Sequence, residues 1–276
     1  MKFNMKTIII PTDFTANADN ALEYGIAMAK EIKASVVLFH VYQIPVATTT
    51  DTPIIVVAED DLRKAAEKNL NRLKSGIESG INKGLKVYTE LRLGDIVTEL
   101  EEFSQKVQPF AIVMGSNFHS GVEQALFGST TLKSVRHVTV PVIAVPPDAK
   151  FNGIKKIGFA CDYKKVVETT PVVPITEVVR AFNATLHIIN VNTESQTGTA
   201  DESILVHNLF KDLGPSYHFI KDENIEHGLS GFAETNYLDL LIAIPKKHRL
   251  LEGLFHKSAT KQLVFHSHIP VMCIHE

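Results

Sequence analysis

Four segments from the first half of the chain recur in the same order in the second half. "MKTIIIPTDFTA" and "IKKIGFACDYKK" each contain an apolar run followed by an aspartate and an aromatic residue. "ASVVLFHVY" matches "ATLHIINVN", "FAIVMGS" matches "LDLLIAIP", and "LFGSTTLKSVRHVTVPVIAVPPD" matches "LFHKSATKQLVFHSHIPVMCIHE". This repeated order indicates an internal duplication. We expect two domains, residues 1–147 and 151–276, joined by a linker near 146–153 that is rich in proline, glycine and polar residues.

Within each half, apolar runs alternate with helical patterns. "KTIIIPT" and "SVVLFHVY" lack polar alternation, which is typical of parallel strands covered on both faces. "TANADNALEYGIAMAKEIKA" places apolar residues along one helical face, with Thr15 as a plausible N-cap. "QIPVATTTDTPIIVVA" is expected to be an irregular surface connection. The pattern predicts an α/β fold with two tandem doubly wound domains, flavodoxin-like or Rossmann-like, each with a five-stranded parallel sheet.

Composition narrows the classes of partner. A chain of 276 residues suits two domains, and its net charge of −3 gives no basic surface for nucleic acid. No apolar stretch is long enough for a signal peptide or a membrane span, so a membrane partner is not expected. Two cysteines in strand-like runs suit a reducing compartment, and we expect a cytoplasmic protein.

Three features of the first half should meet at one edge of the sheet. Asp13 follows the first strand, Val41 ends the second, and a glycine-containing loop follows the fourth strand before a helix starting at Ser129 or Thr130. Ligands of open α/β sheets bind at the carboxyl ends of the strands, and a helix start beside glycines favours anions. The simpler alternatives are that Asp13 only forms a turn and that the glycines only permit one. The chain has neither a Walker A loop nor a GxGxxG motif.

The arrangement resembles the universal stress protein family over nearly the full chain, as two tandem copies. "PTDF" at 11–14 and "HV" at 40–41 resemble the family's adenine and ribose contacts, and Gly115 with Gly128-Ser129 resembles its Gly-x2-Gly-x9-Gly-Ser/Thr nucleotide motif. The resemblance implies a stress-response protein that binds ATP or a related adenine nucleotide, which Mg²⁺ could accompany. The residues it implies for that site are Pro11, Thr12, Asp13, Val41, Met114, Gly115, Gly128, Ser129 and Thr130.

Both halves depart from the family motif. Phe118 stands at its second glycine, where a bulky side chain resists both a positive φ and close approach to phosphate. Gly121 could restore the flexibility, or the Phe118 ring could turn outward. The second half keeps Asp162 and Val191, but it has Ile244 in place of Gly115 and "FHKSAT" in place of "FGST". We expect this half to be a structural partner or to bind another ligand.

Three functions remain open at this point. They are a nucleotide-binding stress protein, a scaffold whose site is empty or holds another metabolite, and a slow nucleotide hydrolase. The sequence offers no catalytic lysine or Ser-His-Asp arrangement, so no catalytic residue is assigned. His266 and His268 lack a third ligand, so no metal site is expected. We expect "PVIAVP" and "IPVMCIH" to join the halves as a pseudo-dimer, and two chains could pair further as a homodimer.

Overall fold

A computed structural model of the chain describes residues 6–49, 52–55, 58–79, 82–116, 129–192, 200–245, 260, 263 and 267–276. The first half contains β1 (Thr7–Pro11), α1 (Ala16–Glu31), β2 (Ser35–Tyr42), β3 (Val46–Thr49), β4 (Thr52–Ile55), α2 (Glu59–Glu78), β5 (Val87–Leu93), α3 (Ile96–Val107), β6 (Ala111–Gly115), α4 (Ser129–His137) and β7 (Val142–Val145). The second half contains β8 (Lys156–Ala160), α5 (Val166–Thr169), α6 (Val172–Phe182), β9 (Thr185–Asn192), α7 (Ala200–Phe210), β10 (Ser216–Lys221), α8 (Ile225–Thr235), β11 (Leu240–Ala243) and β12 (Val271–Cys273).

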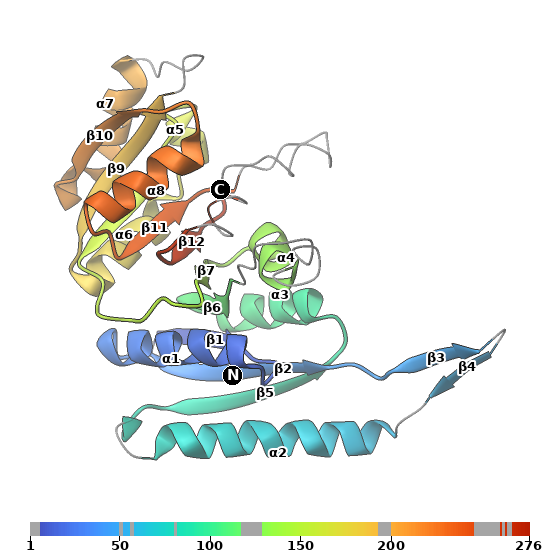
Figure 1. Ribbon diagram of the computed structural model, residues 1–276. Coiled ribbons are helices and arrows are strands. Elements are labelled where there is room, and N and C mark those ends of the chain that lie inside the picture. Colours follow the sequence, from blue (N-terminus) through green and yellow to red (C-terminus); the bar gives the residue numbers. More distant parts are fainter. Residues whose placement is uncertain are drawn as a thin grey trace.

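The main strands form one ten-stranded sheet in the order β10-β9-β8-β11-β12-β7-β6-β1-β2-β5 (Figure 1). The strands of each half are parallel to one another, and the second half repeats the strand order of the first. This confirms the predicted α/β fold. At the centre, β7 and β12 pair antiparallel with Ile143 opposite Met272, so the two segments expected to join the halves lie side by side.

The sequence of β1 explains why this strand lies at the centre of the five sheet strands of the first half. Ile8, Ile9 and Ile10 are all fully buried. Because side chains alternate along a strand, Ile8 and Ile10 face one side of the sheet and Ile9 the other. Each such side chain stabilises the fold by about 1.5–3 kcal/mol through burial. A run of three isoleucines therefore needs helices on both faces.

The helix between β1 and β2 follows from its N-cap and from one glycine. Thr15 caps α1, as predicted, with its side-chain oxygen accepting from the Ala18 backbone N–H. A Cβ atom at Gly25 would lie 2.6 Å from Ile10 Cδ1, so glycine allows α1 to pack closely on β1.

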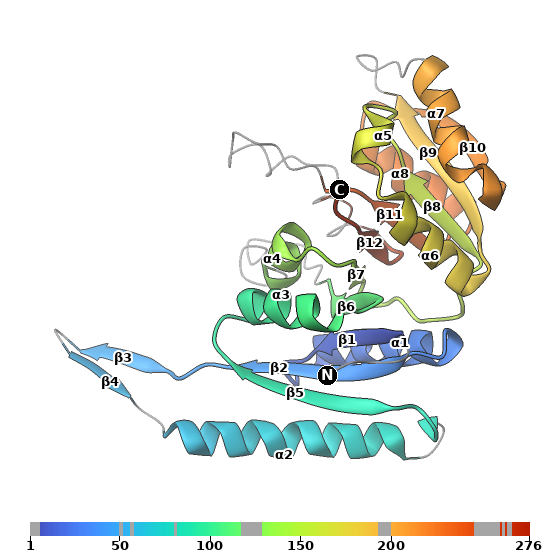
Figure 2. The same cartoon turned by 180° about the vertical axis from the view of Figure 1, so that it is seen from behind.

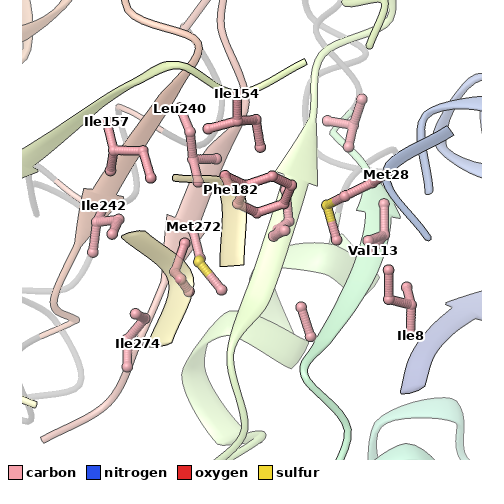
Figure 3. Packing of buried hydrophobic residues seen from close by; sticks show 14 of the residues in the cluster. Ile8, Met28, Val113, Ile154, Ile157, Phe182, Leu240, Ile242, Met272 and Ile274 are labelled. Carbon is pink, nitrogen blue, oxygen red and sulfur yellow. The ribbon is translucent and has the colours of Figure 1, made fainter. Parts of the chain in front are cut away.

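Two apolar cores cover the two faces of the sheet, and both continue from one half into the other. One core contains buried residues of α1, α2, α6 and α7, and the other contains those of α3, α4 and α8. Figure 3 shows the first core, which extends from Ile8, Met28 and Val113 of the first half to Met272 and Ile274 of the second. The halves are therefore joined by shared packing as well as by the β7-β12 pairing.

The connection between β2 and α2 differs from the expected irregular loop. Residues 46–55 contain the antiparallel hairpin β3-β4, in which Val46 pairs with Ile55 and Thr49 with Thr52. Figures 1 and 2 show this hairpin extending away from the main sheet. The many β-branched residues of this stretch favour strands, and Pro53 is tolerated because a two-stranded ribbon consists only of edges.

Candidate functional site

The predicted site residues lie along the carboxyl edge of the first half of the sheet. β1 lies between β2 and β6. The chain passes from β1 to β2 on one side and later enters β6 on the other, so the strand order reverses at β1 (Figure 1). This reversal is where open α/β sheets bind ligands. The end of β1 at Pro11 and the end of β6 at Gly115 flank it.

Thr12 is buried in the turn after β1, where all its polar groups have partners. Its backbone N–H donates to the Phe39 carbonyl at 2.9 Å, and its Oγ1 accepts from the Phe14 N–H at 3.0 Å. His40 Nδ1 lies 2.7 Å from the Thr12 carbonyl oxygen. These bonds make Thr12 a residue that shapes the turn, and its place in the lining of a nucleotide site stays a prediction.

Asp13 is exposed and uses one carboxylate oxygen to hold the same turn. Its Oδ1 accepts from the Thr15 N–H at 3.0 Å and from Thr15 Oγ1 at 2.6 Å. Among the described residues, Oδ2 has no hydrogen-bond partner. The turn-forming alternative for Asp13 therefore holds for one oxygen, while the other can still accept a hydrogen bond from a ligand.

Phe14 follows with a left-handed backbone, φ 63°, which is uncommon for a bulky residue. Its ring centroid lies 4.6 Å from that of His40. His40 therefore contacts both the Thr12 carbonyl and the Phe14 ring. The sequence had singled out His40 only through the "HV" pair and gave no indication of this bridging position.

A hydroxyl group connects the end of β6 to the start of α4. Thr131 Oγ1 donates to the Gly115 carbonyl at 2.8 Å, and the Ser116 N–H donates to the Val145 carbonyl at 2.8 Å. Thr131 is buried and was missed by the sequence reasoning, which chose its neighbours. The only signal available was the run of three hydroxyl residues, "STT", at the helix start.

The remaining predicted residues occupy different positions. Val41 is half-buried near the end of β2, and Met114 is buried within β6. Ser129 is the first described residue of α4, and Thr130 beside it is half-buried. Residues 117–128 lie outside the described part of the chain, and they include Phe118, Gly121 and Gly128.

The second half repeats the turn after the first strand. The Cys161 N–H donates to the Ile189 carbonyl at 2.9 Å, and Asn190 Nδ2 donates to the Cys161 carbonyl at 2.8 Å. Asp162 Oδ1 accepts from the Lys164 N–H at 3.2 Å. Asn190 thus takes the position that His40 has in the first half. The turn is conserved between the halves even though the loop sequences differ.

An aromatic residue again follows the aspartate in this second turn. Tyr163 has φ 52°, like Phe14, and its ring stacks on Phe219 with centroids 5.6 Å apart. Burial raises the pKa of the Tyr163 hydroxyl well above its ordinary value, so this group stays neutral. The residues that replace the glycine loop here, including Lys246, Lys247, His248, His256 and Lys257, lie outside the described residues.

The structure describes one of the two histidines that the sequence analysis considered as metal ligands. His268 is exposed, with Nε2 3.9 Å from Glu234 Oε1, and His266 lies outside the described residues. No cluster of three or more His, Cys, Asp or Glu side chains suited to a metal ion occurs in the part of the chain that the structure describes. Within the same part, no helix is long and apolar enough to cross a membrane.

The strand order defines a doubly wound α/β protein, and its order reverses at β1, where proteins of this class bind ligands. The sequence model of the universal stress protein family matches residues 4–146, just over half of the 276-residue chain. The chain therefore belongs to the universal stress protein family.

Individual relatives agree with this assignment. The chain is 28% identical over 148 residues to a universal stress protein of Methanocaldococcus jannaschii, which covers 52% of this chain and 84% of that protein. It is also 28% identical over 143 residues to the universal stress protein YxiE of Bacillus subtilis, covering 50% of this chain and 97% of that protein. Among solved structures, a universal stress protein from Archaeoglobus fulgidus has the same fold over 99% of both chains, with a TM-score of 0.77 at 20% identity.

Proposed function

We propose that the first half, residues 1–147, binds an adenine nucleotide, with ATP as the expected ligand and Mg²⁺ as its companion ion. The second half, residues 151–276, would serve as its structural partner in an intramolecular pseudo-dimer. The observation that carries the proposal is the second carboxylate oxygen of Asp13, which is exposed beside the strand reversal and has no partner among the described residues.

The nucleoside side of the proposed site fits the described residues. The hydrogen bonds of Thr12 and His40 fix the turn, so Asp13 reaches the edge without needing to be ordered by the ligand. A carboxylate oxygen held in this way is a good acceptor for a ribose hydroxyl, because hydrogen bonds to ionised groups are stronger than neutral ones. Val41, one residue before the end of the adjacent strand, would contribute backbone groups toward the base.

The phosphate side rests on the connection between β6 and α4. The first backbone N–H groups of a helix have no partner within that helix and favour anions. The Thr131–Gly115 hydrogen bond holds this helix start close to the end of β6. Gly115, Ser129 and Thr130 would therefore approach the phosphates, together with Gly128 from the loop.

Two substitutions at Asp13 and one matched control test the proposal by calorimetric titration with ATP and Mg²⁺. Asp13→Asn keeps an oxygen for the Thr15 bonds but replaces the second oxygen with an amide that cannot accept. We expect it to weaken ATP binding about tenfold, the equivalent of one hydrogen bond to a charged group. Asp13→Ala should weaken binding at least as much. Asp162→Ala removes the equivalent turn bond in the second half and should leave binding unchanged.

An equal loss of ATP affinity in the Asp13→Asn and Asp162→Ala variants would contradict this assignment, because it would show that both variants act by lowering the stability of the protein. Unchanged binding in Asp13→Asn would remove Asp13 from the site. If the wild-type chain shows no binding, Phe118→Gly tests whether the aromatic side chain blocks the loop, since the variant should then bind.

The scaffold alternative has its own supporting observation. The β7-β12 pairing and the two shared cores make one continuous body from both halves. Such a body could act as a scaffold without binding any ligand. Absence of ATP binding in both the wild type and Phe118→Gly would favour it. Release of ADP at a steady rate would instead favour the slow hydrolase, for which no catalytic residue is assigned.

A further inference from the structure

A cleft of about 620 Å³ lies between the two halves, at the opposite edge of the sheet from the proposed nucleotide site. Lys6, Phe110 and Pro141 line it from the first half, and each stands directly before a strand, β1, β6 or β7. Helix α6 lines it from the second half with Pro174 and Arg180 among its residues. Since amino and carboxyl ends of parallel strands lie at opposite edges, the cleft is separate from the Asp13 region.

The walls of this interdomain cleft combine apolar and polar residues, and the apolar part is held in place. Pro109, Pro141 and Pro174 all line it, and their rings restrict the backbone. The Phe110 N–H donates to the Thr7 carbonyl at 2.8 Å. The Phe110 ring also packs edge-on against Phe182 of α6, with centroids 6.3 Å apart. The cleft therefore has a preformed apolar floor made by both halves.

Its charged residues are not neutralised by one another. Lys6, Glu177 and Arg180 line the cleft and are exposed. None of the three forms an ion pair with another of the described residues. Lys6 Nζ lies 5.1 Å from the centroid of the Phe110 ring, so its positive charge is held directly over the apolar floor. Among the residues that line the cleft, two cations against one carboxylate leave an excess of one positive charge.

We propose that this cleft binds a small organic monoanion, a carboxylate attached to an aromatic or apolar body. The body would lie on Phe110 and the prolines, and the carboxylate would pair with Arg180 and Lys6. The volume falls within the range of small-molecule sites, which occur preferentially between domains and combine apolar walls with a few polar groups. Glu177 disfavours ligands with several negative charges, including nucleotides.

The test uses the 276-residue chain, with phenylacetate as the probe and neutral phenylacetamide as its matched analogue. Binding of each compound is measured by ligand-observed NMR titration. Phenylacetate should bind saturably and at least about tenfold more tightly than the amide, because the amide lacks the charge. Arg180→Gln should weaken phenylacetate binding about fivefold or more, and Glu177→Gln should strengthen it by removing a like charge. Arg72→Gln, at an exposed arginine of α2 that does not line the cleft, should change nothing.

Three results would overturn the proposal. They are no saturable phenylacetate binding, equal binding of acid and amide, and an Arg180→Gln variant that binds like the wild type. A competition experiment separates this site from the nucleotide site. Saturating ATP should leave phenylacetate binding unchanged, and displacement would place the anion at the other edge. All the substituted residues are exposed, so circular dichroism should show the wild-type fold in each variant.

Discussion

His40 Nδ1 lies 2.7 Å from the carbonyl oxygen of Thr12, and this contact connects the second strand to the turn that presents Asp13. In the second half, Asn190 Nδ2 makes the equivalent bond to the Cys161 carbonyl at 2.8 Å. The two side chains differ in size and chemistry but supply the same donor at the same position. The bond therefore belongs to the architecture of the turn in both halves.

This equivalence predicts the effect of exchanging the donors. His40→Asn should keep most of the stability, because asparagine makes this bond in the second half, whereas His40→Ala should lose about 1–3 kcal/mol by leaving a largely buried carbonyl without its partner. Urea denaturation measures both. Equal losses in the two variants would show that ring packing against Phe14, and not the hydrogen bond, is the main contribution of His40.

Two helical glycines should respond in opposite directions to alanine. Gly25→Ala places a Cβ atom 2.6 Å from Ile10 Cδ1 and should destabilise the fold by about 1–3 kcal/mol through overpacking. Gly76→Ala, in α2, meets no atom within 4 Å and should stabilise it by up to about 1 kcal/mol through helix propensity. Thermal unfolding under identical conditions gives both signs. A stabilising Gly25→Ala would mean that α1 can move away from β1 without loss.

A pair of histidines on neighbouring strands should make stability depend on pH. His187 Nδ1 lies 3.1 Å from His218 Nε2, so one ring donates to the other. Burial lowers the pKa of both below 6.5, and for His187 the nearby His218 and Lys156 contribute as well. The unfolded chain therefore binds more protons than the folded chain around these residues. Their contribution to stability is full at neutral pH and falls as the pH drops below about 6.5.

The variant His218→Gln tests this dependence. Glutamine can still exchange a hydrogen bond with His187 but cannot take up a proton, so the loss of stability between about pH 7 and pH 5 should be smaller than in the wild type. Urea denaturation across that range gives the slope. Comparing the two proteins cancels the opposite contribution of exposed His227, whose pKa Asp222 raises. Identical slopes would show that the pair does not titrate differently in the folded state.

The junction between the halves offers a test of strand register. Ile143 and Met272 are buried and directly opposite in the β7-β12 pair. Replacing either by alanine should cost about 2–5 kcal/mol. Because the two side chains share one environment, the double variant should deviate from additivity by more than about 0.5 kcal/mol. Additive losses at this pair would argue against the register, while Met272→Ala combined with Leu100→Ala, from the opposite core, should serve as the additive control.

The sequence predicted those features that depend on apolar periodicity. The unbroken isoleucines of β1 and the matched runs in both halves specified parallel strands and their repeated order. Thr15 was identifiable as a cap because the residue types that cap helices are few. The edge holding Asp13 and Gly115 followed from the same strand order.

What the sequence did not reveal depends on contacts between distant residues. Nothing local indicates that Thr131, rather than Thr130, turns toward Gly115, since both are hydroxyl residues at a helix start. The sequence does not show that Thr15 bonds to one oxygen of Asp13 and leaves the other available, because this depends on how Thr15 is placed beside it. The β3-β4 hairpin was missed because prolines and threonines are typical of both turns and edge strands.

The antiparallel pairing of β7 with β12 occupies the inner border of each half, leaving β5 and β10 as the outer borders of the sheet. A half expressed alone would present a bare strand there and would be prone to self-association through it. Covalent tethering fixes the stoichiometry at one copy of each half. Mutations can then accumulate separately in the two halves, and one half can lose the ability to bind a ligand while the other half keeps it.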